Sequence, residues 1–283
     1  MKTALIARDE SGNVLYDTSK SIYGLIKSGT VTYHGRWMRL YPSGGVYPSY
    51  QDDIYKFEVE GGISPIVFVY GDCGKPYQSK EGTKHVFYFA GPLLGELKVY
   101  CFDIMRPIFS GPALKTRAEN GKFTFNSLQW PLNVAGTSIP PPVEWVGGAS
   151  GDSIRPFAGG RGYILQYPTM GSGRAGSMYF RVKINLEPTK KYAAHIPWNR
   201  GVEWVYPFET GGGHVGQFRG SGEEGCSGTD GGVHHLIWTA PETTFGSVHT
   251  TTPVRFFNMA GDRLPRCPYI DIAEYPYPFN PQL

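Results

Sequence analysis

The residues best suited to metal chemistry gather between positions 211 and 235. A run of glycines leads to His214, and Cys226 and His234 follow as further imidazole and thiol groups of the kind that bind zinc and other transition metals. A structural zinc site normally has one pair of ligands separated by two to four residues, which this spacing lacks. Adjacent His234 and His235 would also point to opposite faces of a strand. The sequence therefore favours a polar, glycine-rich loop with no cofactor, and keeps His214, Cys226 and His234 as the alternative, a metal site.

Aromatic side chains offer a second kind of chemistry, the stacking of flat rings on sugars. The candidates are Trp198, Trp204, Tyr206, Phe208 and Trp238. Asn199, beside the first of them, is a suitable partner for sugar hydroxyls. The competing interpretation is burial, because sandwich-like proteins need bulky inward-facing residues. We expect most of these rings to belong to the core, and glycan binding by Trp198, Trp204 and Trp238 remains the alternative.

Paired carboxylates would indicate glycan cleavage, which needs two acidic groups on either side of one bond. The adjacent pairs are Asp52 with Asp53 and Glu223 with Glu224. Neighbours on an extended chain face opposite ways, so neither pair meets this need. Glycan hydrolysis by carboxylates from distant segments stays an alternative.

Two further motifs lack the context that their chemistry requires. Residues 171–176 have the spacing of a dinucleotide-binding loop, but the alternating residues after them predict a strand where that site needs a helix N-terminus. Ser153 lies among turn residues, away from the strand-to-helix turn of a nucleophilic serine. The sequence predicts a hairpin loop at the first motif and assigns no catalytic residue, so we expect no enzyme activity.

The elements that must position all these residues have strand patterns. The candidate strands, bounded by Gly, Pro, Asn, Asp or Ser, are 3–8, 13–17, 31–41, 54–59, 65–70, 84–90, 96–104, 122–128, 162–167, 177–186, 202–207, 233–239, 253–258 and 269–274. No window of about a dozen residues keeps helical spacing of its apolar positions. The sequence predicts an all-β, sandwich-like fold of antiparallel sheets with long Gly/Pro-rich loops and little helix.

Proline marks one candidate boundary. Residues 138–142 contain three consecutive prolines and divide the chain into an N-terminal part, 1–137, and a C-terminal part, 138–283. The two parts form either separate domains or one sandwich with a proline-rich crossover. The final segment, 275–281, cannot form a central strand and is expected to be an extended tail that lies on a neighbouring molecule.

Composition excludes several classes of protein. The chain has 283 residues, of which 14% are aromatic, and this apolar area indicates a folded protein. Its net charge is +3 without a basic cluster, so we expect no nucleic-acid partner. Its apolar runs are too short for a signal peptide or a membrane span, which predicts no membrane insertion. The 4 cysteines lie far apart and are expected to be buried and reduced.

Two segments resemble known structural proteins. Residues 4–18 have the pattern of a hairpin, and residues 120–134 that of a turn followed by a strand. The residues that carry the resemblance are Asp9, Gly12, Asn13, Leu15, Asp17 and Thr18, and then Gly121, Phe125, Ser127, Pro131, Leu132 and Val134. At these positions the chain resembles proteins of the tail tip, baseplate or tail fibre of long-tailed bacteriophages.

The resemblance implies a non-enzymatic virion component, assembled in the host cytoplasm into the phage tail. Its implied partners are other phage tail proteins and further copies of itself in a threefold or sixfold homo-oligomer, with a host surface glycan or receptor as an additional partner. A carbohydrate-binding module and a glycan depolymerase are the alternative functions.

Overall fold

Strands make up nearly all of the regular structure in the computed structural model of the protein. It describes residues 6–8, 10–12, 14–17, 21–40, 46–90, 93–146, 154–166, 177–210, 214–239, 246–249 and 255–281. The strands are β1 (Ile6–Arg8), β2 (Val14–Asp17), β3 (Tyr23–Thr30), β4 (Thr32–Leu40), β5 (Val46–Glu60), β6 (Ile66–Tyr70), β7 (Tyr77–Glu81), β8 (Lys84–Ala90), β9 (Lys98–Ile104), β10 (Lys115–Arg117), β11 (Phe123–Asn126), β12 (Gly136–Ser138), β13 (Glu144–Trp145), β14 (Ile154–Arg155), β15 (Arg161–Gln166), β16 (Ser177–Asn185), β17 (Tyr192–Ala194), β18 (Gly201–Thr210), β19 (His214–Thr229), β20 (Gly232–Thr239), β21 (Gly246–His249), β22 (Arg255–Phe257) and β23 (Cys267–Asp271). Among the described residues, the one helical element is the 3-10 turn η1 (Ile272–Glu274), and none is a helix long and apolar enough to cross a membrane. The all-β prediction is confirmed.

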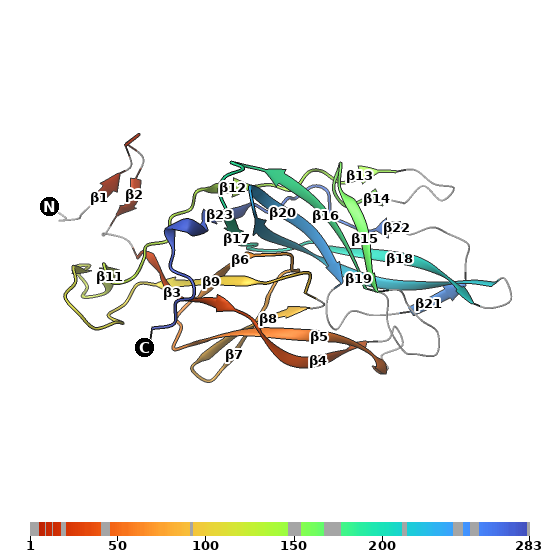
Figure 1. Ribbon diagram of the computed structural model, residues 1–283, viewed down its shortest axis with the longest axis horizontal. Helices are drawn as coiled ribbons and strands as arrows, with labels where there is room; N and C mark the ends of the chain where they lie inside the picture. Colours follow the sequence, from red (N-terminus) through yellow and green to blue (C-terminus); the bar gives the residue numbers. More distant parts are fainter. Residues whose placement is uncertain are drawn as a thin grey trace.

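Most strands belong to one large, curved sheet (Figure 1). Its 15 strands follow the path β12-β23-β17-β6-β19-β18-β22-β14-β13, with β3 and β9 attached through β6 and with β15, β16, β20 and β21 attached through β19. A second sheet has the order β4-β5-β8-β7. Nearly all pairings are antiparallel, as predicted, and the exception is a short parallel contact between β6 and β19.

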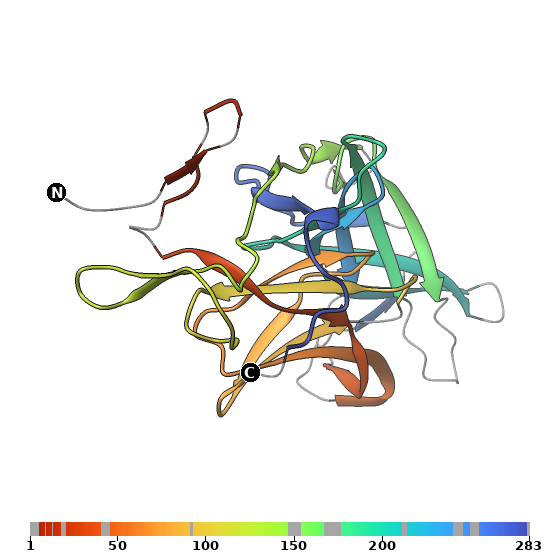
Figure 2. The same cartoon turned by 60° about the vertical axis from the view of Figure 1, so that its left-hand side comes forward.

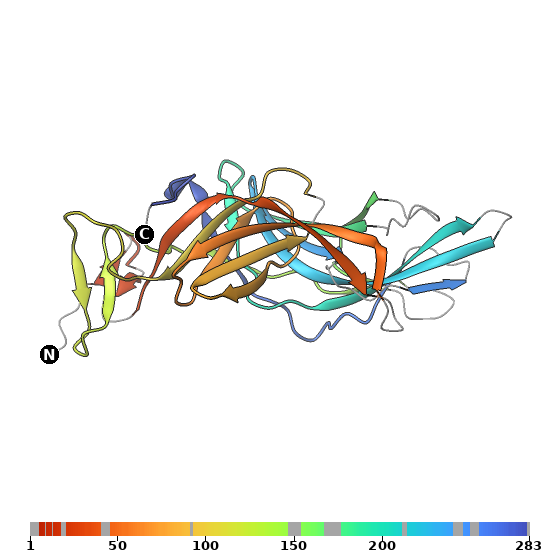
Figure 3. The same cartoon turned by 90° about the horizontal axis from the view of Figure 1, so that it is seen from below.

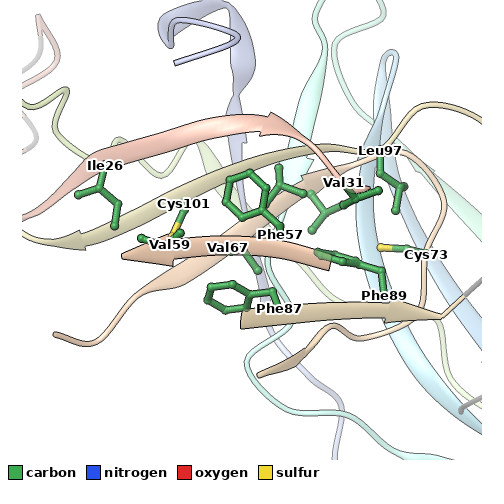
Figure 4. Packing of buried hydrophobic residues seen from close by; sticks show 12 residues of the cluster. Ile26, Val31, Phe57, Val59, Val67, Cys73, Phe87, Phe89, Leu97 and Cys101 are labelled. Atoms are coloured by element: carbon green, nitrogen blue, oxygen red, sulfur yellow. The ribbon is translucent and has the colours of Figure 1, made fainter. Parts of the chain in front are cut away.

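The first core lies between these two sheets (Figure 4). Ile26 of β3, Val67 of β6 and Cys101 of β9 face Phe57 of β5 and Phe87 of β8. Alternating side chains on each strand point into this layer, and burial of each large apolar side chain contributes about 1.5–3 kcal/mol to folding. The packing of sheet on sheet agrees with the predicted sandwich-like fold.

A second core packs on the part of the large sheet formed by β16, β18, β20 and β22. It contains Phe180 of β16, Trp204 of β18, Ile237 of β20 and Phe256 of β22, with Phe157 from the segment before β15. Its strands come from the second half of the chain. The large sheet therefore carries one core against the four-stranded sheet and another within its own curl.

Shared pairing joins the two predicted parts of the chain. β6, from residues before 137, pairs with both β17 and β19, from residues after it. The candidate boundary itself falls on β12, which pairs with β23. Residues 1–137 and 138–283 therefore contribute to one sheet instead of forming a sheet each.

The C-terminal segment packs on its own chain. Backbone groups of Phe279 and Ser28 exchange two hydrogen bonds, and Ser28 Oγ donates to the carbonyl of Pro276 at 2.6 Å. The ring of Tyr275 packs edge-on against Phe102, with centroids 5.0 Å apart. Residues 275–279 thus pack on β3 and β9 of their own chain, where their rings find an apolar surface, and their docking on another molecule stays a prediction.

Two small hairpins and one long arm project from this body. Among the described strands, β1 pairs only with β2 and β10 only with β11, so each hairpin is a sheet of its own. Both lie near the N-terminal end of the molecule, where β1–β2 stands apart from the other sheets (Figure 2), and the ends of β18, β19 and β21 extend at the opposite end (Figure 3). The predicted N-terminal hairpin is confirmed, with Gly12 at a positive φ of 86° in its turn.

Candidate functional site

The β19–β20 hairpin positions most of the chemically distinctive side chains. Its register sets Cys226 opposite His235 and Ser227 opposite His234. Successive side chains on a strand point to opposite faces, so each face of the hairpin presents one of these pairs. The predicted divergence of His234 and His235 is confirmed, because the first contacts a carboxylate from the segment after β6 and the second contacts a serine of β12.

On one face, His234 belongs to a charged network. Its Nδ1 lies 2.5 Å from Oδ1 of Asp72, and Nη1 of Arg181 donates to Oδ2 of the same carboxylate at 2.5 Å. Burial acts to raise the pKa of Asp72, but the hydrogen bond from His234 and the charges of His234 and Arg181 outweigh it and lower that pKa. The guanidinium also lies 5.2 Å from the ring centroid of Tyr163, a cation–π contact. The carboxylate of Asp72 is thus held between His234 and Arg181.

Ser227, His234 and Asp72 have the residue types of a catalytic triad. They do not have its geometry. The side chain of Ser227 is fully buried, and its Oγ has no hydrogen-bond partner within the residues that the structure describes. A nucleophilic serine must bond to its base and reach a substrate. We therefore assign no nucleophile within the described residues. Ser153 and the motif at 171–176 lie outside them.

On the other face, His235 meets two buried cysteines. One is Cys226, and the other is Cys267 from the start of β23; the possible ligand atoms of the three side chains all lie within 4.8 Å of one another. Burial lowers the pKa of His235 to about 3, so its ring is neutral, and burial raises the pKa of the Cys226 thiol. Nε2 of His235 lies 2.8 Å from Oγ of Ser138, and its Nδ1 has no hydrogen-bond partner in the described part of the chain.

The metal candidates chosen from sequence are not brought together. His214 begins β19, and Cys226 lies twelve residues further along the same strand, which separates them by roughly 40 Å. His234 and Cys226 point to opposite faces of the hairpin. Cys267, which sequence reasoning left out, joins Cys226 instead, because β23 crosses near β19 through pairings that no local pattern indicates.

The two acidic neighbours in β19 also have separate partners. Glu223 Oε2 accepts a hydrogen bond of 2.7 Å from Asn199 Nδ2. Glu224 is fully buried and accepts two bonds from Arg200, of 2.7 Å from Nε and 2.8 Å from Nη2. Burial raises the pKa of Glu224, and the bonds from Arg200 partly offset this. The two carboxylates therefore do not flank a common site. Asp53 pairs with Arg36, and the side chain of Asp52 lies outside the described residues.

Two of the three tryptophans considered for sugar binding are core residues, in agreement with the expectation that most of these rings are buried. Trp204 and Trp238 are each 2% exposed, and Trp238 stacks on the ring of Tyr179 with centroids 5.5 Å apart. Burial removes these two rings from a surface platform. Trp198, in contrast, is 38% exposed. The side chains of Tyr206 and Phe208 lie outside the described residues.

A cavity of about 380 Å³ adjoins the segment that carries Trp198. The residues around it include Pro65, Lys75, Tyr77, His195 and Pro197. Lys75 Nζ donates to Oδ1 of Asn199 at 3.3 Å, which ties one wall to the residue after Trp198. Its walls combine apolar side chains with polar ones such as Lys75, Gln78 and His195.

Functional inference for this chain rests on its own residues. No family model matches it, and the comparisons with curated proteins and with solved structures find no match either.

Proposed function

We propose that this protein is a non-enzymatic structural component of a bacteriophage tail end, in the tail tip, baseplate or tail fibre. The observation that carries the proposal is the N-terminal hairpin, β1–β2, which contains residues of the resemblance and stands apart from the other sheets (Figure 2). An isolated two-stranded hairpin is marginally stable at best in water. Docking on another tail protein would stabilise it.

The second hairpin supports the same attachment end. β10–β11 also forms a separate two-stranded sheet, and Asn126 at its base holds the chain by donating to the carbonyls of Arg106 and Ile108 at 2.9 Å. Leu114 and Trp130 beside it are exposed apolar residues. Exposed strand edges and apolar side chains are suited to assembly, and a threefold or sixfold ring of copies would cover them.

Phage particles from the source should carry this chain at the distal end of the tail. The measurement is immunogold electron microscopy with an antibody that recognises the native protein. Particles left unlabelled by that antibody would contradict the proposal.

A chain that lacks residues 1–20 should keep its thermal midpoint but lose incorporation into particles, since the hairpin contributes little to the stability of the other sheets. Incorporation at the full-length level would remove the hairpin from the docking role.

Glycan contact at Trp198 is a second candidate function, favoured by its exposed ring and by the 380 Å³ cavity that the preceding residue, Pro197, lines. Trp198→Ala should weaken binding on an array of host surface glycans about two- to tenfold, because a ring contact contributes about 0.5–1.5 kcal/mol. The matched control is Trp145→Ala, which removes a more exposed tryptophan, 71% accessible, from β13. Equal binding by both variants and the parent would exclude Trp198 as a contact. Release of reducing ends from the glycan would instead indicate a depolymerase.

A further inference from the structure

We propose that Cys226, His235 and Cys267 form a buried zinc site that locks β19, β20 and β23 together. All three residues are buried, with exposed fractions of 2%, 0% and 0%. Their possible ligand atoms lie within 4.8 Å of one another. Two sulfurs and an imidazole are the ligands that zinc takes in proteins.

The geometry is close to that of a bound ion. With zinc–sulfur distances of about 2.3 Å, two sulfurs of a tetrahedral site lie about 3.8 Å apart. The side chains therefore need to converge by no more than about 1 Å. Three protein ligands leave a fourth position, which a water molecule fills in three-ligand zinc sites.

Unsatisfied hydrogen-bonding capacity points to the same ion. Nδ1 of His235 is buried and has no hydrogen-bond partner among the described residues, which is costly unless another group binds to it. The other ring nitrogen, Nε2, lies 2.8 Å from Oγ of Ser138. Metal-bound histidines almost always hold their second nitrogen in this way, so that the ring is oriented for the metal. Ser138 is thus a positioning residue.

The charge of the site favours a divalent ion. Two thiolates and Zn²⁺ sum to zero, so the filled site places no net charge among its apolar neighbours Ala194, Ile196 and Val233. Copper(I), which also suits sulfur ligands, would leave one negative charge there. Binding forms two zinc–sulfur bonds and one zinc–nitrogen bond, and the two thiol protons pass to solvent without electron transfer.

The test is metal content after refolding. The full chain, stripped of metal under reducing and denaturing conditions, is refolded with Zn²⁺ and dialysed against a chelating buffer. We expect one zinc per chain and a higher thermal midpoint than with chelator alone. Refolding with Co²⁺ should give sulfur-to-cobalt charge-transfer absorption. Ser138→Ala should weaken zinc binding about 10- to 100-fold.

Matched cysteine variants separate this site from adventitious binding. Cys226→Ala with Cys267→Ala should abolish zinc retention and the cobalt absorption, whereas Cys101→Ala, at a buried cysteine outside the cluster, should retain both. A natively folded parent without zinc, or equal zinc in the double variant, would overturn the proposal. So would an oxidised Cys226–Cys267 pair, detected as two missing thiols. If the double variant does not fold, the cobalt absorption of the parent chain tests the proposal, because sulfur-to-cobalt charge transfer requires thiolate ligands. Its absence would then overturn the zinc site.

Discussion

Replacing Arg200 with methionine is expected to lower the free energy of unfolding by about 3–5 kcal/mol at neutral pH. The guanidinium is almost fully buried and makes two bonds to the carboxylate of Glu224, whose side chain is 0% exposed. A third bond of 2.8 Å runs from Nη1 to the carbonyl of Ala260. Methionine keeps the apolar stem but leaves a buried carboxylate without its counter-charge, and the loss of that partner dominates the effect.

The size of this loss should depend on pH. Burial already raises the pKa of Glu224 above its ordinary value of 4.5, and removal of Arg200 raises it further. A carboxyl whose pKa is raised on folding does not destabilise the protein below its ordinary pKa; the destabilisation grows as pH rises from that ordinary pKa to the folded-state pKa and is constant above it. The difference between Arg200→Met and the parent should therefore be largest at neutral pH and smallest near pH 4.5.

Urea unfolding at neutral pH and at about pH 5 measures this difference. Arg200→Met combined with Glu224→Leu is the control, because removing both charges of a buried pair is often close to neutral for stability. We expect it to recover most of the loss at neutral pH. A loss below about 1 kcal/mol in Arg200→Met, or the same loss at both pH values, would show that the ion pair does not stabilise the fold in this way.

The strands with clean local signals could be predicted from the sequence. The expected strand at 84–90 coincides with β8 (Lys84–Ala90), and that at 233–239 nearly coincides with β20 (Gly232–Thr239). Both have apolar or aromatic runs between turn residues, which is sufficient to indicate a strand. The absence of helical periodicity gave the fold class for the same reason.

The sequence predicts the wrong structure for the glycine-rich segment before β20, because glycine occurs both in turns and in strands where another backbone approaches closely. It was expected to be a loop, but residues 214–229 form the longest strand, β19. A Cβ on Gly225 would lie 2.7 Å from the carbonyl oxygen of Cys73. Glycine in a strand can mark a close approach of another backbone, and only the partner segment distinguishes this from a turn. That partner is more than a hundred residues away in the chain.

The same difference between local and distant signals applies to the candidate sites. The opposite directions of His234 and His235 follow from strand alternation, which is local, and were predicted correctly. The partners of these two residues, Asp72 and Cys267, come from distant strands and segments, and no spacing rule connects them. Burial of Trp204 and Trp238 likewise depends on which strands lie opposite them.

Gly228→Ala is expected to destabilise the protein by about 3 kcal/mol or more, at or above the upper end of the range for overpacked cores. A Cβ at this position would lie 1.7 Å from the carbonyl oxygen of Tyr192 and 2.6 Å from the Cα of Ala193, both in the backbone of β17. Backbone atoms cannot rotate aside as the end of a long side chain can. Accommodation would require β17 to move away from β19.

That movement would also disturb the contact between the two halves of the chain. The carbonyl of Gly228 accepts a hydrogen bond of 3.0 Å from the amide of Gly71, and Gly228 pairs with Tyr70 in the parallel contact of β6 and β19. Gly201→Ala is the matched control, because no atom lies within 4 Å of its added Cβ and its φ is not positive. We expect this control to change stability by no more than about 1 kcal/mol. Chemical unfolding of both variants is the measurement. Equal stability of the two variants would show that β17 moves to accommodate the methyl group at little cost. A large loss of stability confined to Gly228→Ala would establish that glycine is required where β17 crosses β19.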